Sequence, residues 1–209
     1  MEIGTFEIPN CDQLKGGIDA FARNECRGYV YFEALSHISE NWGDPIEMAR
    51  GIKILLDVWH LSFYRFGNFE LSLLTKCVEH NLSLIDRFKQ RNINSLSSSD
   101  EAEIKDMFNE FLDALRGGNR RSPVAVAKSL HLLAPNFFPL WDTEIAVNYG
   151  SWWVFSDFGA LEYVPFCWKI KHVAENLEVC ECVLNANPNR SLLKLIDEYN
   201  YSKFTKRWI

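Results

Sequence analysis

Residues 98–133 read SSDEAEIKDMFNEFLDALRGGNRRSPVAVAKSLHLL, and this stretch decides the fold. Its first four residues match a capping box, in which a serine accepts an amide hydrogen bond and a glutamate three positions later returns one. Apolar residues then recur every three or four positions as far as Gly117-Gly118, where a helix can end in a left-handed conformation. Ser122-Pro123 starts a second helix, because proline is tolerated in a first turn. The stretch predicts two consecutive helices joined by a short turn.

The same spacing continues on both sides of this stretch. Upstream it predicts three helices, over residues 29–39, 46–66 and 69–88. Downstream it predicts a short helix capped by Asp142, a long helix over residues 160–184 that is kinked or interrupted at Pro165, and a final helix over residues 192–199. No segment alternates convincingly with a period of two, as a half-buried strand would. The sequence therefore predicts an all-α protein with a helical, bundle-like fold.

The composition favours one main core. Of the 209 residues, 47% are hydrophobic, which is enough for a single helical domain over residues 1–209 or for two closely packed lobes. A Ser/Asn-rich run over residues 92–99 predicts a loop and marks the expected lobe boundary. No apolar run approaches the roughly 20 residues of a membrane helix, and the first residues lack a signal-peptide pattern. We therefore expect a cytoplasmic protein that does not associate with a membrane.

The six cysteines are scattered along the chain, and we expect them to be free and mostly buried thiols: Cys11, Cys26, Cys77, Cys167, Cys180 and Cys182. The close pair at residues 180 and 182, with His172 nearby, does not complete the spacing of a structural zinc site. The sequence also contains no phosphate-binding glycine loop and no two-carboxylate metal centre. It predicts neither a metal nor a cofactor.

The net charge of −6 argues against a broadly basic surface that binds nucleic acid without preference, but it leaves room for a local basic site. Such a site is expected in the turn between the two helices, where Arg116, Arg120 and Arg121 surround Gly117 and Gly118.

Residues 116–150 contain a helix end, the glycine-arginine turn, a helix, and then an apolar segment that leads through Pro139 to Asp142 at a helix start. This order resembles the core of the helix-hairpin-helix DNA glycosylase superfamily. The resemblance implies that the hairpin binds a DNA phosphate, that a damaged base is flipped into a pocket, and that an aspartate stabilises the cationic sugar as the base leaves. DNA is then the expected partner.

Matching the residues to that family assigns their roles. Asp142 falls on the aspartate of the family. Ala125 falls where bifunctional members have a nucleophilic lysine, and Lys128 follows three residues later. The two hairpin glycines of the family fall near Arg121 and Pro123. The resemblance thus implies a monofunctional reaction in which water attacks the sugar with the help of Asp142. Lys128 is the second candidate catalytic residue, and that role requires a local geometry different from the family's.

The candidate nucleic-acid-binding residues are those of the turn, and the candidate pocket residues are a histidine and three tryptophans: His131, Trp141, Trp152 and Trp153. Aromatic side chains could stack on a flipped base or could belong to the core. His131 could equally be a hydrogen-bonded core residue.

Other interpretations stay open for this region. Asp142 could serve only as a helix cap, and the arginines could form a solvated turn. The chain would then be a non-catalytic helical scaffold that binds a protein or a small molecule. A third hypothesis is a nucleic-acid-directed factor of a defence or toxin system, although no feature of the sequence selects it.

Overall fold

The computed structural model describes residues 7–65, 67–151, 159–177 and 180–209, and over these residues the protein is all-α, as expected. An isolated bridge between Gly117 and Arg120 is the sole β-type pairing within the described ranges. The helices and short helical turns are α1 (Cys11–Asn24), α2 (Gly28–Glu40), α3 (Pro45–Trp59), α4 (Leu61–Tyr64), α5 (Leu71–Lys89), η1 (Ile93–Ser95), η2 (Ser98–Asp100), α6 (Glu101–Ala114), α7 (Pro123–Leu133), α8 (Thr143–Asn148), α9 (Gly159–Leu177), α10 (Glu181–Asn185), α11 (Leu192–Asn200) and η3 (Tyr201–Thr205).

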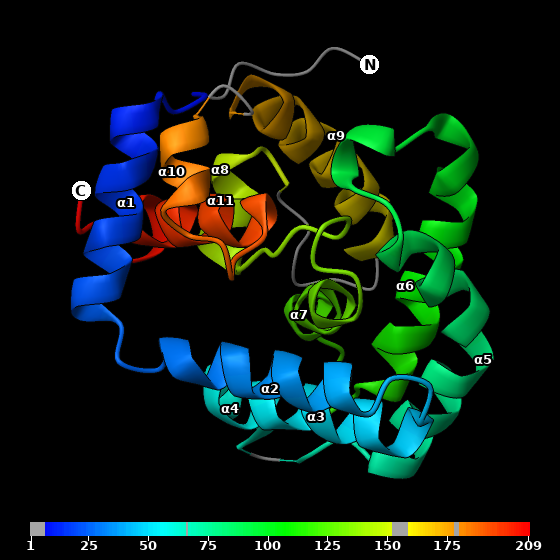
Figure 1. Cartoon of the computed structure of the whole chain (residues 1–209). Coiled ribbons are helices and arrows are strands. Elements are labelled where there is room, and N and C mark those ends of the chain that lie inside the picture. Colours follow the sequence, from blue (N-terminus) through cyan, green and yellow to red (C-terminus); the bar gives the residue numbers. More distant parts are fainter. Residues whose placement is uncertain (1–6, 66, 152–158, 178–179) are drawn as a thin grey trace.

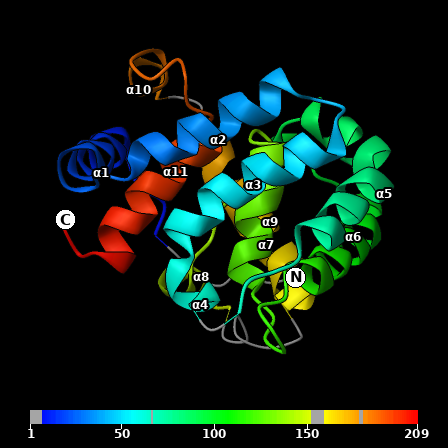
Figure 2. The same cartoon turned by 90° about the horizontal axis from the view of Figure 1, so that it is seen from below.

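Helix α7 passes through the middle of the molecule, and the other helices surround it (Figure 1). Every residue of α7 except Lys128 is buried, as expected for a helix that is apolar on nearly all sides. Helices α2, α3, α5 and α6 follow one another around it, and α9 packs against α6. Helix α1 packs against α11, so the first and last helices of the chain lie side by side (Figures 1 and 2).

The crossing of α1 and α11 depends on a small residue. A Cβ atom at Gly17 would lie 2.7 Å from Tyr199 Cδ2 and 2.8 Å from Tyr199 Cα. Only a glycine allows α1 to approach the α11 backbone this closely. This crossing places η3, which follows α11, against α1 and α8.

Several helix boundaries differ from the prediction. The expected helix over residues 46–66 is interrupted at His60, which ends α3 and precedes α4. The expected helix over residues 160–184 is two helices, α9 with Pro165 inside it and α10 after a non-helical Cys180. The capping box before α6 starts one residue early, at Ser97, whose N–H donates to Asp100 Oδ2 at 2.8 Å.

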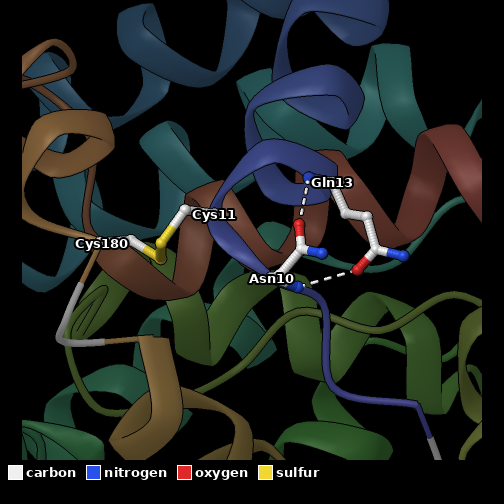
Figure 3. The surroundings of a disulfide bond; sticks show 4 residues. All are labelled: Asn10, Cys11, Gln13 and Cys180. Carbon is white, nitrogen blue, oxygen red and sulfur yellow. Dashed lines mark hydrogen bonds between the residues drawn. A yellow bond between two sulfur atoms is a disulfide. The ribbon is translucent and has the colours of Figure 1, made fainter.

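The expectation of free cysteines is wrong for two of the six. Cys11 at the start of α1 forms a disulfide with Cys180, which directly precedes α10 (Figure 3). The two residues are 169 positions apart, so no local pattern reveals the pair. Of the remaining thiols, Cys77 and Cys167 are buried as expected, whereas Cys26 and Cys182 are exposed.

The expected loop over residues 92–99 contains the short turns η1 and η2, and its Ile93 and Leu96 join the main hydrophobic core. In the part of the chain that the structure describes, no helix is long and apolar enough to cross a membrane.

Candidate functional site

A small cavity lies against α7, where residues far apart in the sequence meet. It is lined from α2, α3, α7, α11, η3 and the segment before α8, by Tyr31, Leu55, Trp59, Lys128, Leu140, Trp141, Asp142, Lys194, Asp197 and Tyr201. Its volume is about 40 Å³, enough for about three water molecules at roughly 10–15 Å³ each. Four charged side chains therefore share a narrow space with aromatic walls.

Lys128 reaches this cavity from α7. Among the residues of α7, Lys128 alone lines the cavity, and all the others are buried. The Nζ atom donates a hydrogen bond to the backbone oxygen of Trp59 at 2.9 Å. Burial lowers the pKa of the amine to about 8, against the opposing effect of the Asp142 carboxylate. Near neutral pH this lysine therefore has a far larger uncharged, nucleophilic fraction than a surface lysine.

Asp142 enters the same cavity as the N-cap of α8, so the predicted cap is present. Its Oδ1 accepts a hydrogen bond from the Ile145 N–H at 2.8 Å, and its Oδ2 accepts one from Thr205 Oγ1 at 2.6 Å. Burial raises the pKa of this carboxyl, while the two hydrogen bonds and Lys128 act in the opposite direction. Asp142 is thus both a structural cap and part of the cavity wall.

Lys128 and Asp142 influence each other electrostatically. The carboxylate raises the pKa of the amine, and the amine lowers the pKa of the carboxyl. The structure therefore brings together the two residues that the sequence identifies as catalytic candidates. Paired groups with oppositely perturbed pKa values inside a cavity are typical of functional sites.

A second lysine in the cavity has the opposite character. Lys194 donates to Asp197 Oδ2 at 2.8 Å and lies 3.7 Å from Glu198 Oε1. Burial lowers the pKa of Lys194, but the two carboxylates outweigh this effect and the pKa is raised overall. Lys194 therefore stays an ammonium group, whereas Lys128 has access to its neutral form.

Aromatic rings form the walls of the cavity on several sides. Trp59 meets Tyr201 edge to face, with ring centroids 5.7 Å apart, and the guanidinium of Arg27 lies 4.4 Å from the centre of the Trp59 ring. Trp141, a predicted pocket residue, lines the cavity, and its indole Nε1 donates to the backbone oxygen of Pro123 at 3.2 Å. The predicted pocket residues Trp152 and Trp153 lie outside the described residues.

His131 is not among the residues that line the cavity, but it supports one of them. Its Nδ1 is 2.8 Å from the Phe138 backbone oxygen, and its Nε2 is 3.0 Å from the Tyr31 hydroxyl. Because a carbonyl can only accept, Nδ1 carries the proton and neutral Nε2 accepts from Tyr31. Burial lowers the pKa of His131 to about 4, so the ring is neutral at physiological pH and fixes the hydroxyl of Tyr31.

The glycine-arginine turn lies outside the cavity, between α6 and α7. Gly117 and Arg120 pair across a tight turn, and Gly118 adopts a φ of +62°. Arg120 Nη2 donates to the backbone oxygen of Phe63 at 2.5 Å, which ties the turn to α4. Arg121 pairs with Asp113 at 2.6 Å.

Arg116 is exposed and, with Arg121, borders an open surface groove beside α6. The predicted nucleic-acid-binding residues therefore lie together in one turn, apart from Lys128 and Asp142; Gly117 is buried, and the others are partly or fully exposed.

A second open groove adjoins the cavity on the other side of Trp59. Trp59 belongs to both, and Arg27 and Arg65 border the groove, with the exposed Leu61 and Ser62 of α4 between them. Within this groove the guanidinium of Arg27 pairs with Glu25, with Nη2 2.7 Å from Oε2.

Several residues of the site were not identified from the sequence. They are the cavity-lining Tyr31, Trp59, Lys194, Asp197 and Tyr201, and Thr205, which donates a hydrogen bond to Asp142. The Trp59-His60 pair stands out in the sequence, but only the fold places it beside Lys128. Within the described ranges, no group of three His, Cys, Asp or Glu side chains converges to hold a metal ion.

Comparison of the chain with protein-family models, with curated proteins and with solved structures finds no match. Functional inference therefore depends on the residues of the site and their chemistry.

Proposed function

We propose that the protein is a DNA-binding N-glycosylase that releases a damaged base. One observation carries the proposal: Lys128 and Asp142, from two different elements, line one aromatic cavity and each shifts the pKa of the other. The resemblance of residues 116–150 to helix-hairpin-helix glycosylases independently favours Asp142.

The chemistry uses an amine and a carboxylate in distinct roles. The neutral Lys128 amine attacks C1′ of the deoxyribose, the bond from C1′ to the base nitrogen breaks, and the base leaves with the electron pair and takes up a proton. The Asp142 carboxylate stabilises the positive charge that develops on the sugar and receives the proton that the amine loses. Opening of the C1′–O4′ bond, with protonation of O4′, leaves an imine between Lys128 and C1′.

The cavity favours a different nucleophile from the one expected from the sequence. The register of the resemblance implies water, because Ala125 occupies the lysine position. The amine of Lys128 nevertheless lines the cavity beside Asp142, and this favours the amine. Borohydride reduction separates the two mechanisms, since an imine gives a covalent protein–DNA product and a water reaction does not.

A flipped base needs more room than the cavity of about 40 Å³ provides. In the proposal, Trp59 and Tyr201 move apart on DNA binding and then stack on the extruded base. The energetic cost of this opening favours bases whose pairing is already weakened by damage.

The glycine-arginine turn supplies the contact with the DNA backbone. Arg116 and Arg120, together with backbone N–H groups of the turn, contact phosphates on one side of the flipped nucleotide. Because the protein carries a net charge of −6, we expect modest binding that weakens steeply with added salt.

The direct test is release of free base from duplexes that carry alkylated, deaminated or oxidised bases. We expect Asp142→Asn and Lys128→Met each to lower the single-turnover rate by at least about a hundredfold. Asp44→Asn is a matched control, because Asp44 also caps a helix, accepting from the N–H groups of Ile46 and Glu47, but does not line the cavity. Equal rates in Asp142→Asn and the wild type would reject the proposal.

The competing function is a non-catalytic scaffold with a protein or small-molecule partner. The small, aromatic cavity and the hydrogen bonds to both oxygens of Asp142 are compatible with it. Fluorescence anisotropy against duplex DNA at low and high salt separates the two, since a scaffold unrelated to DNA shows neither binding nor a salt slope.

A cytoplasmic location completes the proposal. Disulfides are rare in reducing compartments, so the thiol state of Cys11 and Cys180 in protein taken from cells is informative. Labelling of both thiols without prior reduction supports this location, and protection of both argues against it.

A further inference from the structure

The turn η3 has an unusually wide backbone. The Lys206 N–H donates to the Tyr201 backbone oxygen at 2.9 Å, a hydrogen bond that spans five residues and defines a π-type turn. Such turns are rare and frequently occur at functional sites.

In this protein, η3 presents two side chains to the candidate site. Tyr201 lines the cavity. Thr205 donates a hydrogen bond from Oγ1 to Asp142 Oδ2 at 2.6 Å. Between them, buried Ser202 donates to the backbone oxygen of Gly17 at 2.8 Å and anchors the turn to α1.

We propose that Thr205 is a positioning residue for Asp142, which its hydroxyl holds in one orientation and in the ionised form. This inference rests on the proposed function, because it concerns the same carboxylate. The Ile145 N–H fixes Oδ1 from within α8, and Thr205 fixes Oδ2 from η3. Because both oxygens are hydrogen-bonded from different elements, rotation of the carboxylate plane about the Cβ–Cγ bond would break at least one hydrogen bond.

The hydrogen bond also affects the charge of the carboxylate. An ionised carboxylate has no proton to donate, so Thr205 must be the donor, and donation to the charged form stabilises that form. Burial works in the opposite direction and raises the pKa of Asp142. Of the charged groups that face the carboxyl, Lys128 of α7 lowers its pKa and Asp197 of α11 raises it. Each carboxylate oxygen still has a free lone pair, so Asp142 can face a developing cation while it remains fixed.

Three variants distinguish loss of the Thr205 hydrogen bond from a general loss of stability. Thr205→Val keeps the shape of the side chain and removes the donor. Thr205→Ser restores the donor. Ser202→Ala is the matched control, because it removes a buried hydroxyl from the same turn without a contact to Asp142.

The first readout is the titration of the Asp142 carboxyl, followed by NMR in protein with ¹³C-labelled aspartate and assigned with Asp142→Asn. We expect the pKa of Asp142 to be higher in Thr205→Val by about one pH unit or more, because a hydrogen bond to a charged group is worth at least about a factor of ten in protonation. Thr205→Ser and Ser202→Ala should titrate as the wild type does.

The second readout is the single-turnover rate of base release as a function of pH. In Thr205→Val the acidic limb should move to higher pH, with a rate about tenfold lower on that limb. Thr205→Ser should restore the wild-type profile, whereas a variant that merely weakens the fold would not move a pKa.

The two readouts distinguish failure of this inference from failure of the proposed function. If the wild type releases no base, the function fails, and the NMR titration still decides whether Thr205 controls Asp142. If base release depends on Asp142 but Thr205→Val shows the wild-type titration and pH profile, the inference is overturned and the function stands.

Discussion

Lys128 gives the sharpest test of the cavity, because it does not depend on knowing the substrate. Its pKa is lowered by burial from 10.5 to about 8. At about 1.36 kcal/mol for each factor of ten in protonation, the charged amine destabilises the folded protein by about 3 kcal/mol. Lys128→Met removes this penalty and also removes the hydrogen bond to Trp59, which is worth roughly 1 kcal/mol. We therefore expect the variant to be more stable by about 2 kcal/mol near neutral pH.

The pH dependence follows from the sign of the shift. Below about pH 8 the lysine is protonated in both the folded and the unfolded state, so the penalty is complete. Between about pH 8 and 10.5 the folded protein loses the proton first, and the wild type gains stability as the pH rises. The advantage of Lys128→Met should fall to near zero at about pH 9.5.

Urea denaturation followed by far-UV circular dichroism, at about pH 7 and about pH 9.5, measures this difference. Lys15→Met is the control, since Lys15 is an exposed lysine on α1 and its replacement should change little at either pH. A Lys128→Met variant that is less stable than the wild type at pH 7, or that keeps its full advantage at pH 9.5, would refute the argument that a buried amine lines this cavity.

Three further predictions concern the fold. Replacing Cys11 and Cys180 by serine should lower the free energy of unfolding by about 4–5 kcal/mol, because the disulfide spans 169 positions; a urea midpoint unaffected by reductant would contradict this. Gly17→Ala should lower the free energy of unfolding by about 1–3 kcal/mol, since its Cβ would meet a ring carbon of Tyr199 at 2.7 Å. Gly16→Ala is the control: open space surrounds Gly16, so the variant should raise the stability by up to about 1 kcal/mol in thermal melts. The pKa of His131 is lowered from 6.5 to about 4, so the folded protein binds this proton more weakly than the unfolded chain does. The free energy of unfolding should therefore fall by about 3 kcal/mol as the pH drops from about 6.5 to 4. An equally steep loss in His131→Gln would show that another group is responsible.

The helices around the candidate site are predictable because their signals are local. Ser122-Pro123 marks the start of α7, and Asp142 caps α8, as expected from residues within one turn of each boundary. The break at His60 has no such signal, since the apolar spacing continues through it. What sets it apart is a distant contact, the 2.6 Å hydrogen bond between His60 Nε2 and Ser122 Oγ.

Helix α1 carries a signal that the pattern of apolar residues does not reveal. Asn10 and Gln13 form a complete capping box at its start, with hydrogen bonds of 2.8 and 2.9 Å (Figure 3). Reading caps independently of hydrophobic periodicity would have predicted this helix.

The candidate site also has a part that the sequence predicts and a part that only the fold reveals. Lys128 and Asp142 lie 14 positions apart in one segment, so the sequence alone brings them to attention. Trp59, Tyr201 and Thr205 come from elements before and after that segment, and only the packing of α3 and η3 against α7 and α8 brings them to the cavity. Their contribution could not be derived from spacing.

The position of η3 in the sequence has a consequence for synthesis. The ribosome makes α3, α7 and α8 well before residues 201–205, so the central helices can pack while one wall of the cavity and the partner of Asp142 are still missing. At that stage the proposed site is incomplete. Its wall and the hydrogen bond to Asp142 form only once the wide turn has docked on Gly17, which joins completion of the site to the packing of η3 against α1.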